Sequence, residues 1–265
     1  MIVTFLSDFG TADYFAGAMK GAALAVAPGA QVVDITHDIP AHDIEAGAFT
    51  LAAAYEAFPA GTVHLAVVDP GVGSERRALA VEAAGHFFVG PDNGLFGHVY
   101  ERAAGPRAFH LTDPSYFRPQ VSATFHGRDV FAPVAGALSR GVRPEQLGAE
   151  VEDFVRLPLS RPRRLPGGSL EAAVIHVDRF GNLVTNLTPH DLPEAELAAG
   201  RARLLVGARE VRRFRRFYAE AAEDPSEPFA IWGSAGFLEI AVNRGSAARA
   251  LGAARGHKII VTGDE

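Results

Sequence analysis

The sequence predicts an α/β protein with an N-terminal, mostly parallel sheet flanked by helices and a smaller C-terminal, all-β, barrel-like domain. Three observations predict this. Strand-like and helix-like stretches alternate in the first half, a stretch rich in Pro, Arg and Gly follows, and short strand-like stretches with turn signals come after it. The expected boundaries are 1–157 for the α/β domain, 158–169 for the linker and 170–265 for the β-barrel domain.

The elements of the first domain follow from apolar runs bounded by glycine and proline. Ile2–Ser7 and Thr62–Asp69 are typical of buried strands. Tyr14–Ala27 is rich in alanine and Asp43–Phe58 has apolar residues at helical spacing, so both are expected to be helices. Further strands are expected at Gln31–Thr36, Ala78–Ala83, Phe87–Val89 and Arg107–Leu111, and a further helix at Val130–Ser139. Strands that alternate with helices favour parallel pairing.

The second domain shows short apolar runs separated by turn residues. Strands are expected at Ala172–Asp178, Leu183–Leu187, Ala202–Val206, Phe237–Val242 and Lys258–Val261. Their spacing indicates a small barrel-like domain. The basic stretch Arg212–Arg216 is expected to be a solvated face over neighbouring apolar residues.

Composition restricts the class of function. The 265 residues include no cysteine, which removes disulfides, thiolate nucleophiles and zinc–thiolate or iron–sulfur sites. The net charge of −6 argues against a general binder of nucleic acid or anionic membranes. No apolar run approaches the ~20 residues of a membrane span, and the N-terminus is typical of a strand rather than a signal peptide. We therefore expect a soluble, cytoplasmic protein without nucleic-acid or membrane partners.

Two aspartates end predicted strands and precede turns that contain glycine. Asp8 and Asp69 would lie at the sheet edge where open α/β sheets bind ligands. The turn after Asp69 reaches Arg76, and folding back would let the carboxylate and guanidinium pair. Alternatively, either aspartate can cap the next element, and the pair can be purely structural. Neither turn has a GxxxxGK[ST] or GxGxxG pattern, so nucleotide chemistry of those types is not expected.

Histidines give two further hypotheses. His126 lies just before the helix expected at Val130–Ser139, and histidine is well suited to exchange a proton near neutral pH. A structural histidine is the alternative. The segment that holds His37, Asp38 and His42 is dense in possible metal ligands, but it lacks HExxH spacing. The neighbouring Asp43 fits a helix N-cap.

Polar residues also gather at two turns of the second domain. Asp178, Phe180 and Asn182 lie between two expected strands, and Ser234 and Asn243 flank another. An Asn amide offers both a donor and an acceptor, which suits the edge of a purine base. Hairpin formation explains either turn equally well. From the residues alone, we expect a ligand-binding, two-domain α/β enzyme.

Seven motifs, in order along nearly the whole chain, resemble those of the S-adenosyl-L-methionine hydrolases, or hydroxide adenosyltransferases, which are related to fluorinase and chlorinase. They are SDFG (7–10), DITHDIP (34–40), VVDPGVGSERR (67–77), GPDNGLFG (90–97), TFHGRD (124–129), DRFGNLVTN (178–186) and GSAGFLEIAVNRG (233–245). The resemblance implies that water attacks C5′ of S-adenosylmethionine and releases adenosine and L-methionine, with no metal or cofactor. It also implies a homotrimer with each site between the N-terminal domain of one chain and the C-terminal domain of the next.

The same resemblance implies roles for individual residues. Asp69, Arg76 and His126 match the catalytic trio, in which Asp69 and His126 would position the water and accept its proton. Arg76 would stabilise the developing hydroxide. Asp8 matches the carboxylate that binds the ribose hydroxyls. The other substrate contacts implied are Phe180, Asn182 and Asn243 for adenine, Asp178 for the methionine ammonium and Ser234 for its carboxylate.

Three alternatives stay open. A halogenase would have a tyrosine in place of Asp69, and a carboxylate ~4 Å from a halide costs about 4 kcal/mol at an effective dielectric constant of about 20. That repulsion favours hydrolysis over halogenation. The chain can also be a protein that binds S-adenosylmethionine or adenosine without turnover. The third alternative is a metal-dependent hydrolase that uses His37, Asp38 and His42.

Overall fold

The chain forms two compact units, Met1–Leu159 and Ser160–Glu265. The computed structural model describes residues 1–158, 160–220, 224 and 226–263. Within these described residues, no helix is both long enough and apolar enough to cross a bilayer.

The N-terminal unit is built on a seven-stranded sheet with the order β2-β1-β3-β5-β4-β6-β7. Its strands are β1 (Ile2–Ser7), β2 (Gln31–Thr36), β3 (Val63–Val67), β4 (Ala78–Ala83), β5 (His86–Pro91), β6 (Arg107–His110) and β7 (Glu150–Val151). β2, β1, β3 and β5 pair in parallel, whereas β4, β6 and β7 each pair antiparallel with their neighbours. The predicted α/β class is therefore confirmed.

The change of strand direction at β4 has a local cause. β4 and β5 are joined by only Ala84 and Gly85, which both have positive φ angles, 51° and 77°. A two-residue turn with this backbone joins antiparallel strands, because a parallel connection needs a long crossover. β4 therefore starts at the sheet edge where β1 and β3 end.

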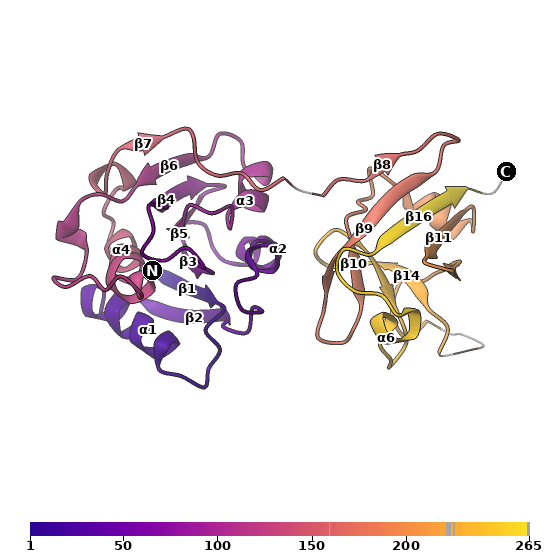
Figure 1. Cartoon of the computed structure of the whole chain (residues 1–265), viewed down its shortest axis with the longest axis horizontal. Helices are drawn as coiled ribbons and strands as arrows, with labels where there is room; N and C mark the ends of the chain where they lie inside the picture. Colours follow the sequence, from indigo (N-terminus) through magenta and orange to yellow (C-terminus); the bar gives the residue numbers. More distant parts are fainter. Residues whose placement is uncertain (159, 221–223, 225, 264–265) are drawn as a thin grey trace. The chain divides into compact units, whose positions relative to one another are not determined.

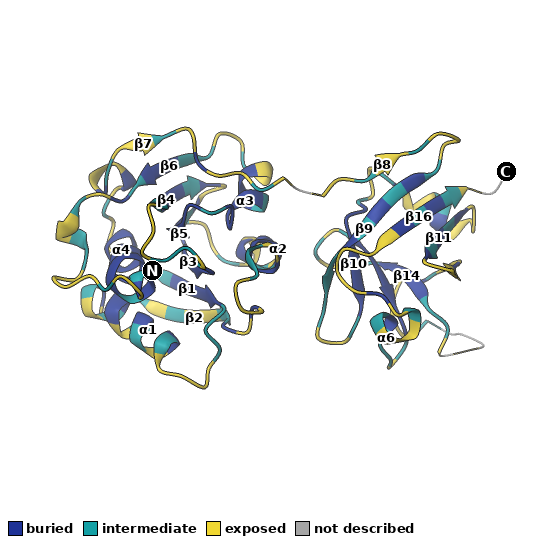
Figure 2. Ribbon diagram, in the orientation of Figure 1, coloured by how far each residue is buried: buried dark blue, intermediate teal, exposed yellow. Residues whose placement is uncertain are grey.

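Helices cover both faces of this sheet (Figure 1). They are α1 (Phe15–Val26), α2 (Ile44–Ala54), α3 (Gly97–Arg102) and α4 (Ala132–Ser139), with a π-helical turn at Gly127–Phe131 and 3₁₀ turns at Tyr55–Ala57, Pro114–Tyr116 and Pro144–Gln146. α1 and α4 share a core with Phe5 and Leu65, while α2 and α3 pack in a second core with Phe88. Figure 2 shows that β1 and β3 are buried along their length. Apolar burial on both faces is typical of central parallel strands.

The order of β2, β1 and β3 creates a topological switch point. The chain leaves β1 through α1 on one face to reach β2, and then returns through α2 on the other face to reach β3. β1 and β3 are direct neighbours, with Ser7 opposite Val67. Ligands of open α/β sheets bind beyond the carboxyl ends of the strands at such a point.

The C-terminal unit is a curved, barrel-like sheet with the order β12-β11-β16-β9-β10-β15-β14-β13, and β8 also pairs with β9. Its elements are β8 (Arg163–Arg164), β9 (Leu170–Val177), β10 (Leu183–Thr185), α5 (Glu194–Ala198), β11 (Ala202–Val206), β12 (Arg209–Val211), β13 (Arg213–Phe214), β14 (Phe229–Trp232), β15 (Leu238–Ala241), α6 (Ala247–Leu251) and β16 (Lys258–Gly263). β13 pairs in parallel with β14, and the other described pairs are antiparallel. The apolar core includes Leu183, Val211, Ile240 and Ile259.

Two details of this unit differ from the sequence-based expectations. Within the stretch expected to be a linker, Arg163–Arg164 pair with β9 as β8. In the basic stretch Arg212–Arg216, Arg215 is buried and its guanidinium lies 4.1 Å from the centre of the Phe229 ring, so the expectation of a fully solvated face is wrong there. A planar guanidinium can stack on an aromatic ring and so become buried.

Candidate active site

The loops that carry the predicted site residues of the N-terminal unit lie at the switch point of the sheet. Asp8 follows β1, His37 follows β2 and Asp69 follows β3, all at one edge of the sheet. The loop from Asp69 ends at β4, and its Gly73 has a φ of 79°. A side chain at Gly73 would place its Cβ 2.3 Å from the carbonyl oxygen of Ala123, so this loop packs closely against the segment before His126.

Asp69 and Arg76 form a bidentate ion pair. Arg76 Nε donates to both carboxylate oxygens of Asp69 at 3.0 and 3.1 Å, and Nη2 lies 2.5 Å from Oδ2. The two side chains are only 4% and 10% exposed, respectively. The guanidinium also lies 5.2 Å from the centre of the Phe131 ring. The predicted pairing across the glycine-rich turn is therefore confirmed, and it fixes the orientation of both groups.

His126 completes this cluster, because its Nδ1 lies 2.9 Å from Arg76 Nη2. Arginine can only donate, so Nδ1 accepts and the ring proton of neutral His126 is on Nε2. Burial and the Arg76 charge lower the pKa of His126, and they outweigh the opposite effect of Asp69 and Asp129. His126 is therefore neutral at pH 7, with an N–H group as its free end.

Asp8 is held by the loop that follows β2. Its Oδ2 accepts from the backbone N–H of His42 at 2.8 Å, and its side chain is largely buried. His42 has a φ of 66°, which is uncommon for a residue with a side chain. The backbone of His42 makes the hydrogen bond to Asp8, while its exposed imidazole lies farther away, with Nδ1 4.0 Å from Asp8 Oδ2.

The three residues considered as metal ligands do not converge. Both ring nitrogens of His37 are engaged, Nδ1 with Ser7 Oγ at 2.7 Å and Nε2 with Asp34 Oδ1 at 3.2 Å. The backbone of Asp38 bonds to Thr36 Oγ1, and the His42 side chain is exposed. Among the residues that the structure describes, no group of three or more His, Cys, Asp or Glu side chains is arranged to hold a metal ion. Asp43 caps α2 by accepting from the N–H of Ala46 at 2.9 Å, as predicted.

In the C-terminal unit, Asp178 organises the turn between β9 and β10. Its Oδ1 accepts from the backbone N–H groups of Phe180 and Asn182 at 2.9 and 2.8 Å, and its Oδ2 accepts from Asn182 Nδ2 at 2.8 Å. Asn182 is buried, whereas the Phe180 side chain is 76% exposed. The turn therefore presents an ordered carboxylate beside a free aromatic ring.

The other two predicted residues lie in the turns at either end of β15. Asn243 lies between β15 and α6, and the start of α6 packs on the Asp178 turn, since the N–H of Ala248 donates to the carbonyl of Gly181 at 2.9 Å. Ser234 is exposed in the hairpin between β14 and β15. Because β10 and β15 pair antiparallel, with Leu183 opposite Ile240, the segment after β15 lies at the same end of the sheet as the Asp178 turn. Contacts of Asn243 and Ser234 with a ligand stay predictions.

Comparison with known proteins identifies the family. The N-terminal domain model of the SAM hydroxide adenosyltransferases matches residues 3–148, and their C-terminal domain model matches residues 172–260. The chain belongs to the SAM hydroxide adenosyltransferase family.

Individual relatives agree with this assignment to the SAM hydroxide adenosyltransferases. A protein of Thermus thermophilus named (R)-S-adenosyl-L-methionine hydrolase is 44% identical, over 96% of each chain. A protein of Actinoplanes named fluorinase is more distant, at 28% identity over 73% of this chain and 74% of its own. The crystal structure of an uncharacterized conserved protein from Thermotoga maritima has a TM-score of 0.91 and 31% identity, covering 98% of this chain and 99% of that one.

In this member of the family, sequence reasoning missed two groups of residues that pack around the predicted site residues. Buried Asp129 accepts from the N–H of Ser122 at 2.9 Å and from Arg128 Nε at 2.7 Å, which fixes the His126 loop. The Phe125 ring lies 5.9 Å from that of Phe9, so the loops of His126 and Asp8 are packed together. The signal was present, because Asp129 and Phe125 lie within the same motif as His126.

The second group of residues that sequence reasoning missed lies in the C-terminal unit. Glu239 of β15 is buried and accepts from the Tyr218 hydroxyl at 3.0 Å. A Cβ at Gly233 would lie 1.9 Å from Glu239 Oε1, so the carboxylate covers the backbone beside Ser234. Burial raises the pKa of Glu239 with help from the Asp178 charge, and together they outweigh the opposite effect of the Tyr218 hydrogen bond. A buried acid thus lies beside the turns that carry Ser234 and Asp178.

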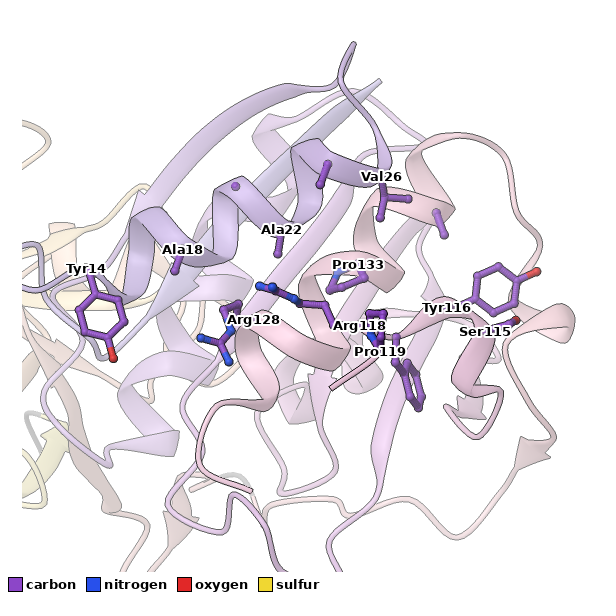
Figure 3. Close-up of a pocket in the computed structure, with 14 residues that line it drawn as sticks. Tyr14, Ala18, Ala22, Val26, Ser115, Tyr116, Arg118, Pro119, Arg128 and Pro133 are labelled. Atoms are coloured by element: carbon purple, nitrogen blue, oxygen red, sulfur yellow. The ribbon is translucent and has the colours of Figure 1, made fainter. Parts of the chain in front are cut away.

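The N-terminal unit also has a groove of about 680 Å³ between α1 and the segment 115–119. Figure 3 shows Tyr14 at one end of this groove and Tyr116 at the other. Its lining is largely apolar, with Ala18, Ala22 and Pro133 among the lining residues. None of the predicted site residues lines it, so it is separate from the Asp69–Arg76–His126 cluster.

Proposed function

We propose that this chain hydrolyses S-adenosyl-L-methionine to adenosine and L-methionine. The observation that carries this proposal is the hydrogen-bonded cluster of Asp69, Arg76 and His126 at the switch point of the sheet. Membership of the SAM hydroxide adenosyltransferase family and the relatives named (R)-S-adenosyl-L-methionine hydrolase support it.

The chemistry explains why these residue types suit the reaction. The leaving group is good, because the sulfonium departs as a neutral thioether. Water is the weak partner, since its pKa is about 15.7. The protein must therefore hold a water molecule in line with the C5′–S bond and remove its proton during attack.

The hydrogen bonds assign a direction to that proton transfer. Because His126 Nδ1 accepts from Arg76, the Nε2–H of His126 donates to the water oxygen and orients its lone pair. The proton then passes to the carboxylate of Asp69 as oxygen bonds to C5′, and the C5′–S electron pair leaves with sulfur. The guanidinium of Arg76 offsets the charge of Asp69 and of the developing hydroxide. Asp69 is thus the proton acceptor, and His126 is an orienting donor.

In the proposed function, residues of both units bind the substrate. Asp8 binds the ribose hydroxyls, and Asp178 pairs with the methionine ammonium. Phe180 and Asn243 contact the adenine, and Ser234 binds the methionine carboxylate. Since Asn182 Nδ2 is bonded to Asp178, the amide oxygen of Asn182 is the atom that accepts from the adenine amino group.

We propose that the reaction uses no metal ion or cofactor. A neutral thioether needs no Lewis acid to leave, and both ring nitrogens of His37 are already hydrogen-bonded. We further propose a cytoplasmic homotrimer without nucleic-acid or membrane partners, in which each site combines Asp69 from one chain with Asp178 from the next. The family resemblance is the support for this assembly.

The test is incubation of the purified protein with S-adenosylmethionine in halide-free buffer containing EDTA, followed by chromatography. We expect equal release of adenosine and methionine, lost in Asp69→Asn and kept in Glu75→Gln, which changes an exposed carboxylate of the same loop. Tight binding without turnover would favour a sensor instead. Activity that requires added metal would favour the metal-dependent hydrolase, and a 5′-halogenated nucleoside formed with added halide would favour a halogenase.

A further inference from the structure

Four side chains near Asp8 are linked in series by hydrogen bonds, and none of them has a part in the proposed chemistry. Lys20 of α1 donates to Asp34 Oδ2 at 2.6 Å, and Asp34 Oδ1 lies 3.2 Å from His37 Nε2. His37 Nδ1 lies 2.7 Å from the hydroxyl of Ser7, the last residue of β1. This chain of side chains thus links α1, β2 and the end of β1.

Each hydrogen bond in this chain has a fixed direction. The Asp34 carboxylate can only accept, so His37 Nε2 donates to it, and in the neutral ring Nδ1 then accepts from the Ser7 hydroxyl. Burial acts to raise the pKa of Asp34, but the contacts with Lys20 and His37 outweigh it and hold that pKa below its ordinary value. The Ser7 oxygen in turn accepts from the N–H of Phe9 at 3.3 Å.

Backbone hydrogen bonds also join the two segments on either side of Asp8, residues 7–10 and 37–42. The N–H of Gly10 donates to the carbonyl of His37 at 2.7 Å, and the N–H of Ile39 donates to the carbonyl of Ser7 at 3.3 Å. The loop that contains His37 also supplies the His42 N–H that binds the Asp8 carboxylate at 2.8 Å. The turn that carries Asp8 is thus joined to the loop at residues 37–42, both by these backbone bonds and by the bond between His37 and Ser7.

A nucleophilic role for Ser7 does not fit this geometry. Ser7, His37 and Asp34 are the residue types of a hydrolytic triad. However, Ser7 and His37 are 0% and 3% exposed, and the Ser7 oxygen already accepts from the Phe9 N–H. The chain of side chains is therefore suited to holding the backbone rather than to attacking a substrate.

We propose that His37 is a positioning residue that fixes the Asp8 carboxylate for the 2′- and 3′-hydroxyls of the substrate's ribose. The inference rests on the proposed function for the identity of the nucleoside. Without His37, the turn at residues 7–10 and the loop at residues 37–42 lose their shared side-chain anchor. Asp8 then samples orientations that cannot accept from both hydroxyls, and binding of the ribose weakens.

The test compares His37→Leu with wild type on S-adenosylmethionine and on its 2′-deoxy analogue. We expect KM for S-adenosylmethionine to rise about tenfold or more, the effect of losing a hydrogen bond to a charged group, with a smaller change in kcat. The increase should be smaller for the 2′-deoxy analogue, which has already lost one of the two hydroxyls that Asp8 binds. His37→Leu should add little in an Asp8→Asn background, and His37→Gln should restore part of the affinity.

A matched control is His86→Phe, which alters another buried histidine of the same sheet. It should lower the melting temperature without changing KM. The positioning role would be overturned if His37→Leu raised KM equally for both substrates. It would also be overturned if the effects of His37→Leu and Asp8→Asn on KM were additive. If His37→Leu does not fold, Ser7→Ala removes only one link and should raise KM in the same substrate-selective way.

Calorimetric binding of adenosine and 2′-deoxyadenosine separates this inference from the proposed hydrolysis. His37→Leu should bind adenosine more weakly and lose the preference for the 2′-hydroxyl. If that holds in a protein with no hydrolytic turnover, the proposed function fails and the positioning role stands. If turnover is present but the preference is unchanged, the positioning role fails alone.

Discussion

Nη2 of Arg76 lies 2.9 Å from Nδ1 of His126, and this single contact decides which ring nitrogen of the histidine carries a proton. Protonation of Nδ1 would bring two cations together and break the hydrogen bond. The neutral ring is therefore the form compatible with the clustered geometry, and Asp69 is the remaining group that can accept a proton.

The contact between Arg76 and His126 predicts how kcat/KM falls at acidic pH. Burial and the Arg76 charge lower the pKa of His126, so kcat/KM should be at its plateau at pH 7 and fall as pH drops through a value below 6.5. Replacing Arg76 with Gln should raise the pKa of His126, measured by NMR titration of its ring proton. An acid limb at or above pH 6.5, with no shift in Arg76→Gln, would contradict the assigned proton position.

Mixing two inactive variants tests the assembly. Asp69→Asn alters the N-terminal unit and Asp178→Ala the C-terminal unit. If each site combines adjacent chains of a trimer, co-refolding equal amounts should regenerate intact sites and up to about a quarter of wild-type activity. Sites built within single chains would give no recovery. Each variant refolded alone is the control.

Phe180 offers a test of adenine binding with little effect on stability. The residue is 76% exposed, so Phe180→Ala removes few contacts within the unit. Base–aromatic stacking contributes about 1–3 kcal/mol, which predicts a KM increase of about 5- to 150-fold. The melting temperature should change by less than about 2 °C. Phe217→Ala, at another exposed aromatic residue of the same unit, should leave KM unchanged.

His64 should make the N-terminal unit sensitive to acid. It is buried between Thr4 and His86, and burial, followed by the His86 charge, lowers its pKa to about 3. The unfolded chain binds a proton near pH 6.5, so stability is full above that pH and declines as pH falls toward 3. The free energy of unfolding should be about 2 kcal/mol lower at pH 5 than at pH 7 from this group.

Urea unfolding at both pH values measures that effect. His64→Gln should be less stable at pH 7, because its packing is altered, but it should lose this part of the pH dependence. If wild type and His64→Gln show the same decrease between pH 7 and pH 5, another group is responsible.

β1 to β6 of the first unit were predictable because they are apolar runs bounded by turn residues, whereas the two-residue β7 was not predicted. The Asp69–Arg76 pair was also accessible, since a short glycine-rich turn brings its own ends together. The contact between Arg76 and His126 was not derivable from the residues, because 50 positions separate them and only packing joins their loops. Family resemblance supplied that grouping instead.

Short elements were harder to predict. α3 has six residues and no capping side chain, and burial of Val99 and Tyr100 holds it in place. β14 follows the basic stretch, and its Phe229 receives the stacked guanidinium of Arg215. In both cases tertiary packing decides the structure, and local sequence preference contributes little.

The reversal of direction at β4 has a consequence for how this site can change. Because β3 and β4 run in opposite directions, residues 68–77 form one loop with both ends anchored in strands at the same edge of the sheet. That loop carries Asp69 and Arg76, two of the three groups that we propose act on the nucleophile. Exchanging it leaves every strand register intact, so the identity of the attacking species can diversify while the sheet and the nucleoside-binding residues stay the same.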